Sequence, residues 1–298
     1  MRFLFASLFA FLCSLAAGAD NAPRLTLPLW PQTTAGANPA LHETDTTTDR
    51  DQLIAGRRVE RLTNVTAPTV ALYPAPAGNN SGTSIVVFPG GGYRILALDL
   101  EGTEVCNWLN SSGISCILLK YRVPDAGPYP KHSEDLADAQ RAVRLTRQHA
   151  ADWNLRADRI GVLGFSAGGH LAAVLSNHAA EPVYKSMDAA DSLNAKPDFV
   201  VMIYPGGLVH PPNLTVLGEE VTPTPETPQT FLVQAEDDPV HVENTLLYYD
   251  ALKRANVPAE MHVYAHGKHG YGLRETALPI TRWPVLAITW FHTIGVLQ

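Results

Sequence analysis

The feature that most constrains this chain is a glycine-flanked serine in the pentapeptide Gly164-Phe165-Ser166-Ala167-Gly168. A short β-branched and apolar run, 159–163, precedes it, and an alanine- and leucine-rich segment, 169–175, follows it. This order predicts a strand that turns sharply into a buried helix, with Ser166 at the apex. The two glycines leave room where strand, turn and helix crowd together. The pattern therefore indicates a nucleophile elbow with an exposed serine hydroxyl.

Strands and helices alternate along most of the 298 residues. Residues 83–88 form a continuous apolar run, typical of a strand that is covered on both faces of a parallel sheet. We expect eight strands, at 59–65, 69–73, 83–88, 114–121, 159–163, 198–204, 230–234 and 260–264. Helices are expected at 102–110, 133–149, 169–175 and 242–255. The predicted fold class is α/β, with one doubly wound, mostly parallel sheet flanked by helices.

The N-terminal part of the chain is predicted to lie outside this sheet. Residues 1–19 combine Arg2, a short apolar stretch and the small residues Ala17-Gly18-Ala19, which together predict a secretory signal peptide. Residues 20–56 are rich in Pro, Thr, Asn and Asp without a sustained period, so we expect a surface arm. Residues 57–298 then form a single α/β domain. The expected location is secreted or periplasmic, with no membrane association after signal cleavage.

Composition excludes some partners and leaves other questions open. The formal net charge of −7 gives no reason to expect nucleic-acid binding. No metal-ligand spacing occurs, so neither a metal nor another cofactor is expected. Cys106 and Cys116 form a disulfide or remain two buried thiols, and both alternatives stay open. The oligomeric state is not determined by the sequence.

The connection between the strands at 198–204 and 230–234 is unusual for its prolines. It contains Pro205, Pro211, Pro212, Pro223, Pro225 and Pro228. A tight, irregular segment of this kind has little room for helices. We therefore expect no large lid over the site.

Candidate partners for Ser166 follow the last two strands. A serine hydroxyl needs an adjacent base, which is itself oriented by an acid. Glu236-Asp237-Asp238 follows one strand, and His266-Gly267-Lys268-His269 follows the next. Both loops lie where the order nucleophile, acid, histidine requires them.

Four motifs together resemble the α/β-hydrolase superfamily: Pro89-Gly90-Gly91-Gly92-Tyr93, the elbow, Glu236-Asp237-Asp238-Pro239-Val240 and Gly267-Lys268-His269-Gly270-Tyr271-Gly272. More narrowly, the chain is similar to exported esterases of the acetyl xylan and feruloyl esterase type. These are related to the hormone-sensitive-lipase and prolyl-oligopeptidase branches. The resemblance extends from about residue 59 to the C-terminus. Pro89 departs from the His-Gly-Gly-Gly pattern of lipases, which loosens a lipase-type assignment.

The resemblance implies a role for each motif residue. Ser166 is the expected nucleophile and His269 the expected general base, with His266 as the weaker candidate. The family pattern places the acid three residues before a valine, here Val240, which implies Asp237; Asp238 is the alternative. The expected oxyanion hole uses backbone N–H groups of Gly91, Gly92 and Ala167.

The sequence thus predicts a serine carboxylesterase that hydrolyses short acyl esters, acetyl above all, on a small molecule or a polysaccharide. A serine peptidase of the prolyl-oligopeptidase type and a general lipase or esterase are the alternatives. A non-catalytic binding module on the same fold is disfavoured, because candidates for nucleophile, base and acid are all present.

Overall fold

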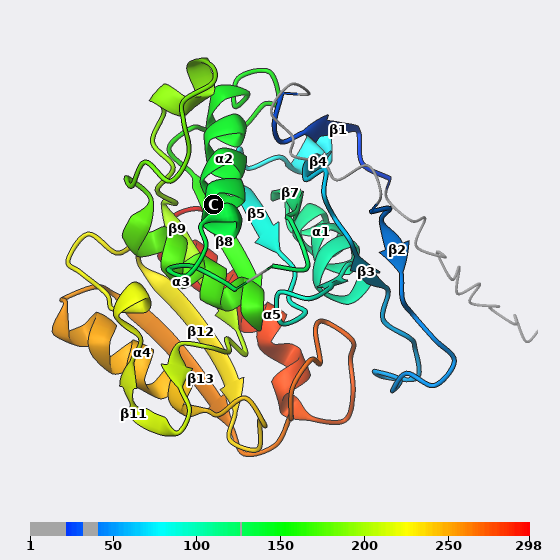
Figure 1. The fold of residues 1–298 in the computed structure, drawn as a ribbon, viewed down its shortest axis with the longest axis vertical. Coiled ribbons are helices and arrows are strands. Elements are labelled where there is room, and N and C mark those ends of the chain that lie inside the picture. The colour runs from blue at the N-terminus through cyan, green and yellow to red at the C-terminus, as the bar shows by residue number, and fades with distance from the viewer. Residues whose placement is uncertain (1–21, 32–40, 126) are drawn as a thin grey trace, which may run out of the picture.

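The computed structural model describes residues 22–31, 41–125 and 127–298. Its main sheet has eight strands in the order β1-β4-β7-β5-β8-β9-β12-β13 (Figure 1). Strands β7, β5, β8, β9, β12 and β13 are parallel, and β4 runs antiparallel to both of its neighbours. This confirms the predicted eight-stranded, mostly parallel sheet. The predicted signal peptide, 1–19, lies outside the described residues.

The strands of this sheet are short and mostly buried. Their bounds are β1 Leu25–Pro28, β4 Thr69–Tyr73, β5 Ser84–Phe88, β7 Ser115–Lys120, β8 Ile160–Phe165, β9 Phe199–Ile203, β12 Thr230–Ala235 and β13 Ala259–Tyr264. Every residue of β5, β8, β9 and β12 is buried, as expected for strands covered on both faces.

Helices cover both faces of the sheet. They are α1 Glu104–Ser111, α2 Glu134–Gln148, α3 Ala167–His178, α4 Glu243–Arg254 and α5 Trp283–Thr293. Successive strand residues point to opposite faces, so Val86 and Phe88 belong to the core shared with α2, α3 and α4, whereas Ile85 and Val87 belong to the core shared with α1 and α5. Figure 1 shows α2 and α3 in front of the strands and α5 behind them. The result is two hydrophobic cores separated by the sheet.

The predicted strand 59–65 differs from the structure. Only Arg61–Thr63 is extended there, as β3, and it pairs with β2 Thr44–Asp45 and β6 Leu96–Ala97 in a separate three-stranded sheet. The eighth strand of the main sheet is instead β1, from the segment predicted as a surface arm. It pairs antiparallel with β4. An edge strand needs one partner and is mostly exposed here, so hydrophobic periodicity gave little sign of it.

The proline-rich connection between β9 and β12, all of which is described, forms short elements. A hairpin of β10 Val209–His210 and β11 Asn213–Leu217 is followed by the 3-10 turn η4, Glu219–Val221. No helical lid is inserted between these two strands. On the opposite face of the sheet, Cys106 of α1 and Cys116 of β7 form a disulfide with Cα atoms 5.1 Å apart, which settles the question left open by the sequence.

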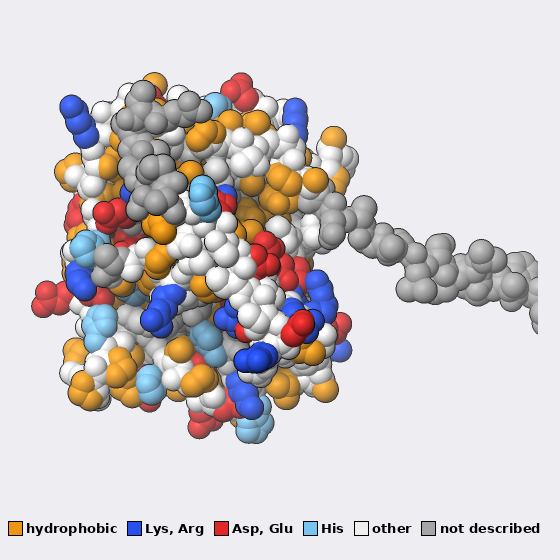
Figure 2. Space-filling view, turned by 45° about the vertical axis from the view of Figure 1, so that its right-hand side comes forward, with side chains coloured by type: hydrophobic (Ala, Val, Ile, Leu, Met, Phe, Trp, Pro, Cys, Tyr) orange, Lys and Arg blue, Asp and Glu red, His pale blue; other side chains and the backbone are white. Residues whose placement is uncertain are grey.

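Two further findings concern the described residues as a whole. None of their helices has both the length and the apolar character needed to cross a membrane. On the face shown in Figure 2, acidic, basic and hydrophobic side chains are interspersed.

Candidate active site

Ser166 occupies the sharp turn between β8 and α3, as predicted. Its backbone has φ 52° and ψ −116°, a conformation that L-residues rarely adopt. A Cβ atom on Gly164 would lie 2.0 Å from the carbonyl oxygen of Gly168, and one on Gly168 would lie 2.0 Å from that of Phe88. Both glycines are therefore required by close backbone packing around the serine.

His269 lies between the serine and a buried carboxylate. Its Nε2 is 2.8 Å from Ser166 Oγ, and its Nδ1 is 2.9 Å from Asp238 Oδ2. The Asp238 side chain is fully buried and also accepts hydrogen bonds from Gln234 Nε2 at 3.2 Å and from the Val240 N–H at 2.9 Å. These contacts fix the carboxylate, which in turn fixes the orientation of the imidazole.

The prediction that Asp237 orients His269 is wrong in this structure. Asp237 Oδ1 accepts hydrogen bonds from the N–H groups of Lys268, at 2.7 Å, and Gly267, at 2.9 Å. The Lys268 N–H is the main cause that lowers the pKa of Asp237, with Gly267 and the nearby His266 adding to it. In the turn after β12, Asp238 points inward and Asp237 outward. Asp237 thus braces the histidine loop from outside.

The glycine loop after β5 faces the serine. Gly91 has φ 136°, and a Cβ atom there would lie 2.0 Å from the carbonyl oxygen of Ile95, so another residue could not keep this loop conformation. The N–H groups of Gly91, Gly92 and Ala167 donate no hydrogen bond to another described residue. Ala167 is the first residue of α3, where the helix dipole favours negative charge. All three N–H groups are thus free to bind a substrate oxygen.

Ser166, His269, Gly91 and Gly92 line one hollow of about 360 Å³. Its other walls are mainly apolar, with three polar side chains, and comprise Gln52, Ile54, Val59, Arg61, Ile95, Ala97, Leu100, Glu101 and Gly270. Of these residues, Gln52 and Ile54 belong to the predicted surface arm 20–56, and Val59 and Arg61 belong to the predicted strand 59–65. These four residues form a wall of the site that the sequence pattern did not indicate.

Arg274, which follows the histidine loop, binds the backbone of the segment 52–61 that contains these wall residues. The Arg274 guanidinium is buried. It donates hydrogen bonds to the carbonyl oxygens of Arg57, at 3.0 Å, and Arg58, at 2.8 Å. It also pairs with Asp99 at 2.7 Å and Glu104 at 2.8 Å. Such long-range contacts leave no local signal in the sequence.

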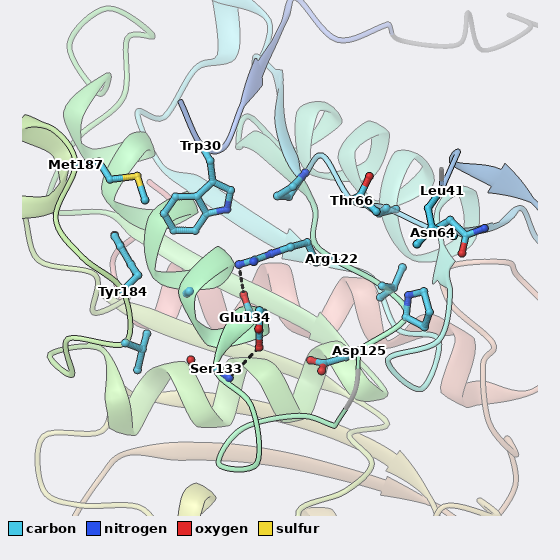
Figure 3. Close-up of a pocket in the computed structure, with 16 residues that line it drawn as sticks. Trp30, Leu41, Asn64, Thr66, Arg122, Asp125, Ser133, Glu134, Tyr184 and Met187 are labelled. Atoms are coloured by element: carbon cyan, nitrogen blue, oxygen red, sulfur yellow. Dashed lines mark hydrogen bonds between the residues drawn. The ribbon is translucent and has the colours of Figure 1, made fainter. Parts of the chain in front are cut away.

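A larger hollow of about 480 Å³, shown in Figure 3, does not have Ser166 among its lining residues. Trp30, Arg122, Ser133, Glu134 and Tyr184 are among its lining residues. Arg122 donates to the Glu134 carbonyl oxygen at 2.9 Å, and the Ser133 N–H donates to the Glu134 side chain at 3.2 Å. Its described lining contains no histidine beside a serine, so it lacks the pairing needed for nucleophilic catalysis.

The remaining candidate residues have structural surroundings. His170, predicted to be a buried core histidine, is 3% exposed, and its Nδ1 lies 2.7 Å from the Tyr93 hydroxyl. Tyr93, Tyr204 and Tyr271 are all buried. In the part of the chain that the structure covers, no three His, Cys, Asp or Glu side chains gather as a metal site would require.

Models of two known protein families match parts of the chain. A family model described as BD-FAE matches residues 71–244, more than half of the chain. The model of the prolyl oligopeptidase family matches residues 216–282.

Curated relatives are longer than this chain. An acetylxylan esterase of Xylanibacter ruminicola is 30% identical over 218 residues, which cover 65% of this chain and 42% of that protein. Endo-1,4-beta-xylanase B of Butyrivibrio fibrisolvens is 31% identical over 206 residues, covering 62% of this chain and 32% of that protein. The chain therefore spans less than half the length of these two relatives.

A solved structure matches over nearly the whole chain. It is an acetyl ester-xyloside bifunctional hydrolase from Caldicellulosiruptor lactoaceticus, with 32% identity and a TM-score of 0.73. The match covers 94% of this chain and 100% of that one.

Proposed function

The chain belongs to the BD-FAE family and has the α/β-hydrolase fold, and from this premise we propose that it is a serine carboxylic ester hydrolase. The observation that carries the proposal is the hydrogen-bonded series from Asp238 through His269 to Ser166, with distances of 2.9 and 2.8 Å. This series has the geometry of a nucleophile, a general base and an orienting acid.

The proposed reaction proceeds through an acyl-enzyme. Ser166 Oγ attacks the ester carbonyl carbon while His269 Nε2 takes the hydroxyl proton, and Asp238 stabilises the resulting imidazolium. The N–H groups of Gly91, Gly92 and Ala167 bind the negative oxygen of the tetrahedral intermediate. The ester C–O bond then breaks, and His269 returns the proton to the departing alcohol. A water molecule, activated by the same histidine, hydrolyses the acyl-serine and releases the acid.

We propose acetylated carbohydrate, such as acetyl xylan, as the substrate. The names of the Xylanibacter and Caldicellulosiruptor relatives refer to acetyl esters and to xylan or xyloside. The hollow of about 360 Å³ suits a short acyl group against its apolar wall. Gln52 and Arg61 offer hydrogen-bond donors for a sugar at the rim.

The test compares the wild type with Ser166→Ala on p-nitrophenyl acetate, butyrate and octanoate and on acetylated xylan. We expect acetate to react fastest, xylan to release acetate, and the variant to lose both activities. Fast octanoate hydrolysis without deacetylation of xylan would assign the site to a general esterase or lipase. Full activity of Ser166→Ala would overturn the proposed mechanism.

A peptidase is the second candidate, because the prolyl oligopeptidase model matches residues 216–282, which include the loop carrying Asp238 and His269. The ester hydrolase is favoured because the BD-FAE match is longer. Cleavage of a proline-containing chromogenic peptide faster than p-nitrophenyl acetate would reverse this order.

We also propose that the protein is exported. The sequence of residues 1–19 supports this proposal, and so does the Cys106–Cys116 disulfide, since disulfides persist in oxidising compartments. Export predicts that the mature protein recovered outside the cytoplasm begins near Asp20, which N-terminal sequencing measures. An intact Met1 on the recovered protein would contradict it.

A further inference from the structure

A carboxyl group is buried directly behind the glycine loop. Glu101 lies in the π-helical segment Asp99–Thr103 that leads into α1, and it is 4% exposed. Its Oε2 accepts a hydrogen bond from the Gly90 N–H at 2.7 Å, and its Oε1 accepts one from the Tyr204 hydroxyl at 2.8 Å. Both oxygens are thereby engaged by the protein.

The Gly90 backbone connects this carboxyl to the serine. A Cβ atom on Gly90 would lie 2.6 Å from the Phe165 carbonyl oxygen and 2.9 Å from Ser166 Cβ. The Gly90 backbone is therefore packed against the nucleophile itself. Gly91 and Gly92 follow immediately, so the direction of the Gly90 N–H sets where their N–H groups lie relative to Ser166 Oγ.

Tyr204 connects the same carboxyl to the histidine loop. It directly follows β9, with φ 40°, and its hydroxyl oxygen accepts a hydrogen bond from the Gly272 N–H at 3.0 Å. Its ring packs edge-to-face with the ring of His269, with centroids 4.9 Å apart. One buried group thus bridges the two loops that meet at Ser166.

Stability alone does not account for a carboxyl at this position. Burial is the main cause that raises the pKa of Glu101, against the hydrogen bonds from Tyr204 and Gly90 that lower it. Removing a carboxyl group from water costs free energy that two hydrogen bonds offset in part. Groups retained at such a cost are often found where a site needs fixed geometry.

We propose that Glu101 is a positioning residue, which holds the oxyanion loop through Gly90 and the histidine loop through Tyr204 in one arrangement around Ser166. This inference rests on the proposed function of the site. It predicts that Glu101 acts on the transition state more than on substrate binding, because its contacts fix donors that bind the developing oxyanion.

The test uses Glu101→Leu, which removes both acceptors, and Glu101→Gln, whose amide oxygen can still accept from Gly90. With p-nitrophenyl acetate we expect kcat to fall about 100-fold in the leucine variant, with KM changed less than about threefold. The glutamine variant should stay within about tenfold of wild-type kcat. Affinity for a phenyl trifluoromethyl ketone, which forms a tetrahedral adduct with the serine, should fall in parallel with kcat/KM.

Matched variants separate positioning from a general loss of structure. Asp198 also accepts a backbone N–H, from Ile160 at 2.8 Å, but at the opposite end of β8, so Asp198→Ala should retain kcat. If Glu101→Leu does not fold, Glu101→Asp serves instead, since its shorter side chain cannot reach both partners and kcat should again fall. Wild-type kcat in Glu101→Leu or Glu101→Asp would overturn the positioning role while leaving the proposed function intact. Full activity in Ser166→Ala would overturn the proposed function first.

Discussion

At the scale of single residues, two adjacent carboxylates have separate surroundings. Asp238 is buried and contacts His269, whereas Asp237 lies outside and holds two N–H groups of the histidine loop. The two residues differ by one position after the same strand. Their side chains diverge because the turn after β12 directs successive side chains to opposite sides. Only one of them can complete the proposed triad.

Substitution of each aspartate by asparagine separates the two roles. We expect Asp238→Asn to lower kcat by about 10³- to 10⁴-fold, because an uncharged amide cannot stabilise the imidazolium or select its tautomer. Asp237→Asn should cost less than about tenfold, since its amide oxygen can still accept from Lys268. Steady-state kinetics with p-nitrophenyl acetate measure both. The reverse order of effects would restore Asp237 as the acid.

At the scale of secondary-structure elements, α2 begins with an unusual buried acid. Asp135 is fully buried, its Oδ1 has no hydrogen-bond partner among the described residues, and its Oδ2 is 3.4 Å from the Tyr129 N–H. Burial is the main cause that raises its pKa to about 7, from an ordinary value of 3.8. The unfolded chain therefore loses this proton at lower pH than the folded protein, so the free energy of unfolding falls as pH rises from about 4 to about 7.

Asp135→Asn should remove this pH dependence. Above pH 7 we expect the variant to be more stable than the wild type, by on the order of 2–4 kcal/mol. Below about pH 4 both states of the wild type carry the proton, and the advantage should disappear. Urea unfolding at pH 4 and pH 8 measures the difference. An equal effect at both pH values would contradict the raised pKa.

The disulfide between α1 and β7 links two neighbouring secondary-structure elements. Cys106 and Cys116 are separated by 10 residues along the chain. Closing a loop of this length stabilises a protein by about 2–3 kcal/mol, mainly by restricting the unfolded state. We expect the double variant Cys106→Ala, Cys116→Ala to lose this much while keeping kcat, as measured by urea unfolding and esterase assays. A reducing agent should destabilise the wild type and leave the variant unchanged; equal sensitivity of both would argue against the bond.

At the scale of the whole molecule, the N-terminal segment is part of the folded body. Strand β1 extends the main sheet, and the residues that follow it, Leu29 and Trp30, are buried against α2. Trp30 Nε1 donates a hydrogen bond to Asp138 Oδ1 at 2.7 Å. Farther along the chain, Gln52 and Ile54 line the candidate active site. The described residues of segment 20–56 therefore contribute to the sheet, the core and the site.

Truncation of Trp30 tests this integration. We expect Trp30→Ala to lower the free energy of unfolding by about 3–5 kcal/mol, because it leaves a cavity in the core and removes one hydrogen bond to Asp138. Esterase activity at 25 °C should persist, since Trp30 does not line the hollow that contains Ser166. Leu25→Ala, on the 38% exposed side chain of β1, should cost under about 1 kcal/mol and serves as the control. Equal stability of both variants would indicate that the segment is a detachable arm.

The sequence by itself determined the class of fold and the position of the nucleophile. Buried strands can be recognised as apolar runs in the sequence, and the glycines around Ser166 meet steric requirements that are local in the chain. Hence the parallel sheet and the elbow could be predicted, while the resemblance of the motif at 267–272 implied His269 as the partner of Ser166.

Only the tertiary structure decided which of Asp237 and Asp238 contacts His269. It also decided that β1 pairs with β4, that residues from 52–61 line the site, and that Glu101 is buried behind the glycine loop. Each of these depends on contacts between residues far apart in sequence, or on the direction of one side chain in a turn. Sequence periodicity records which residues are buried within an element, but it does not record which distant backbone a carboxylate or an edge strand will meet.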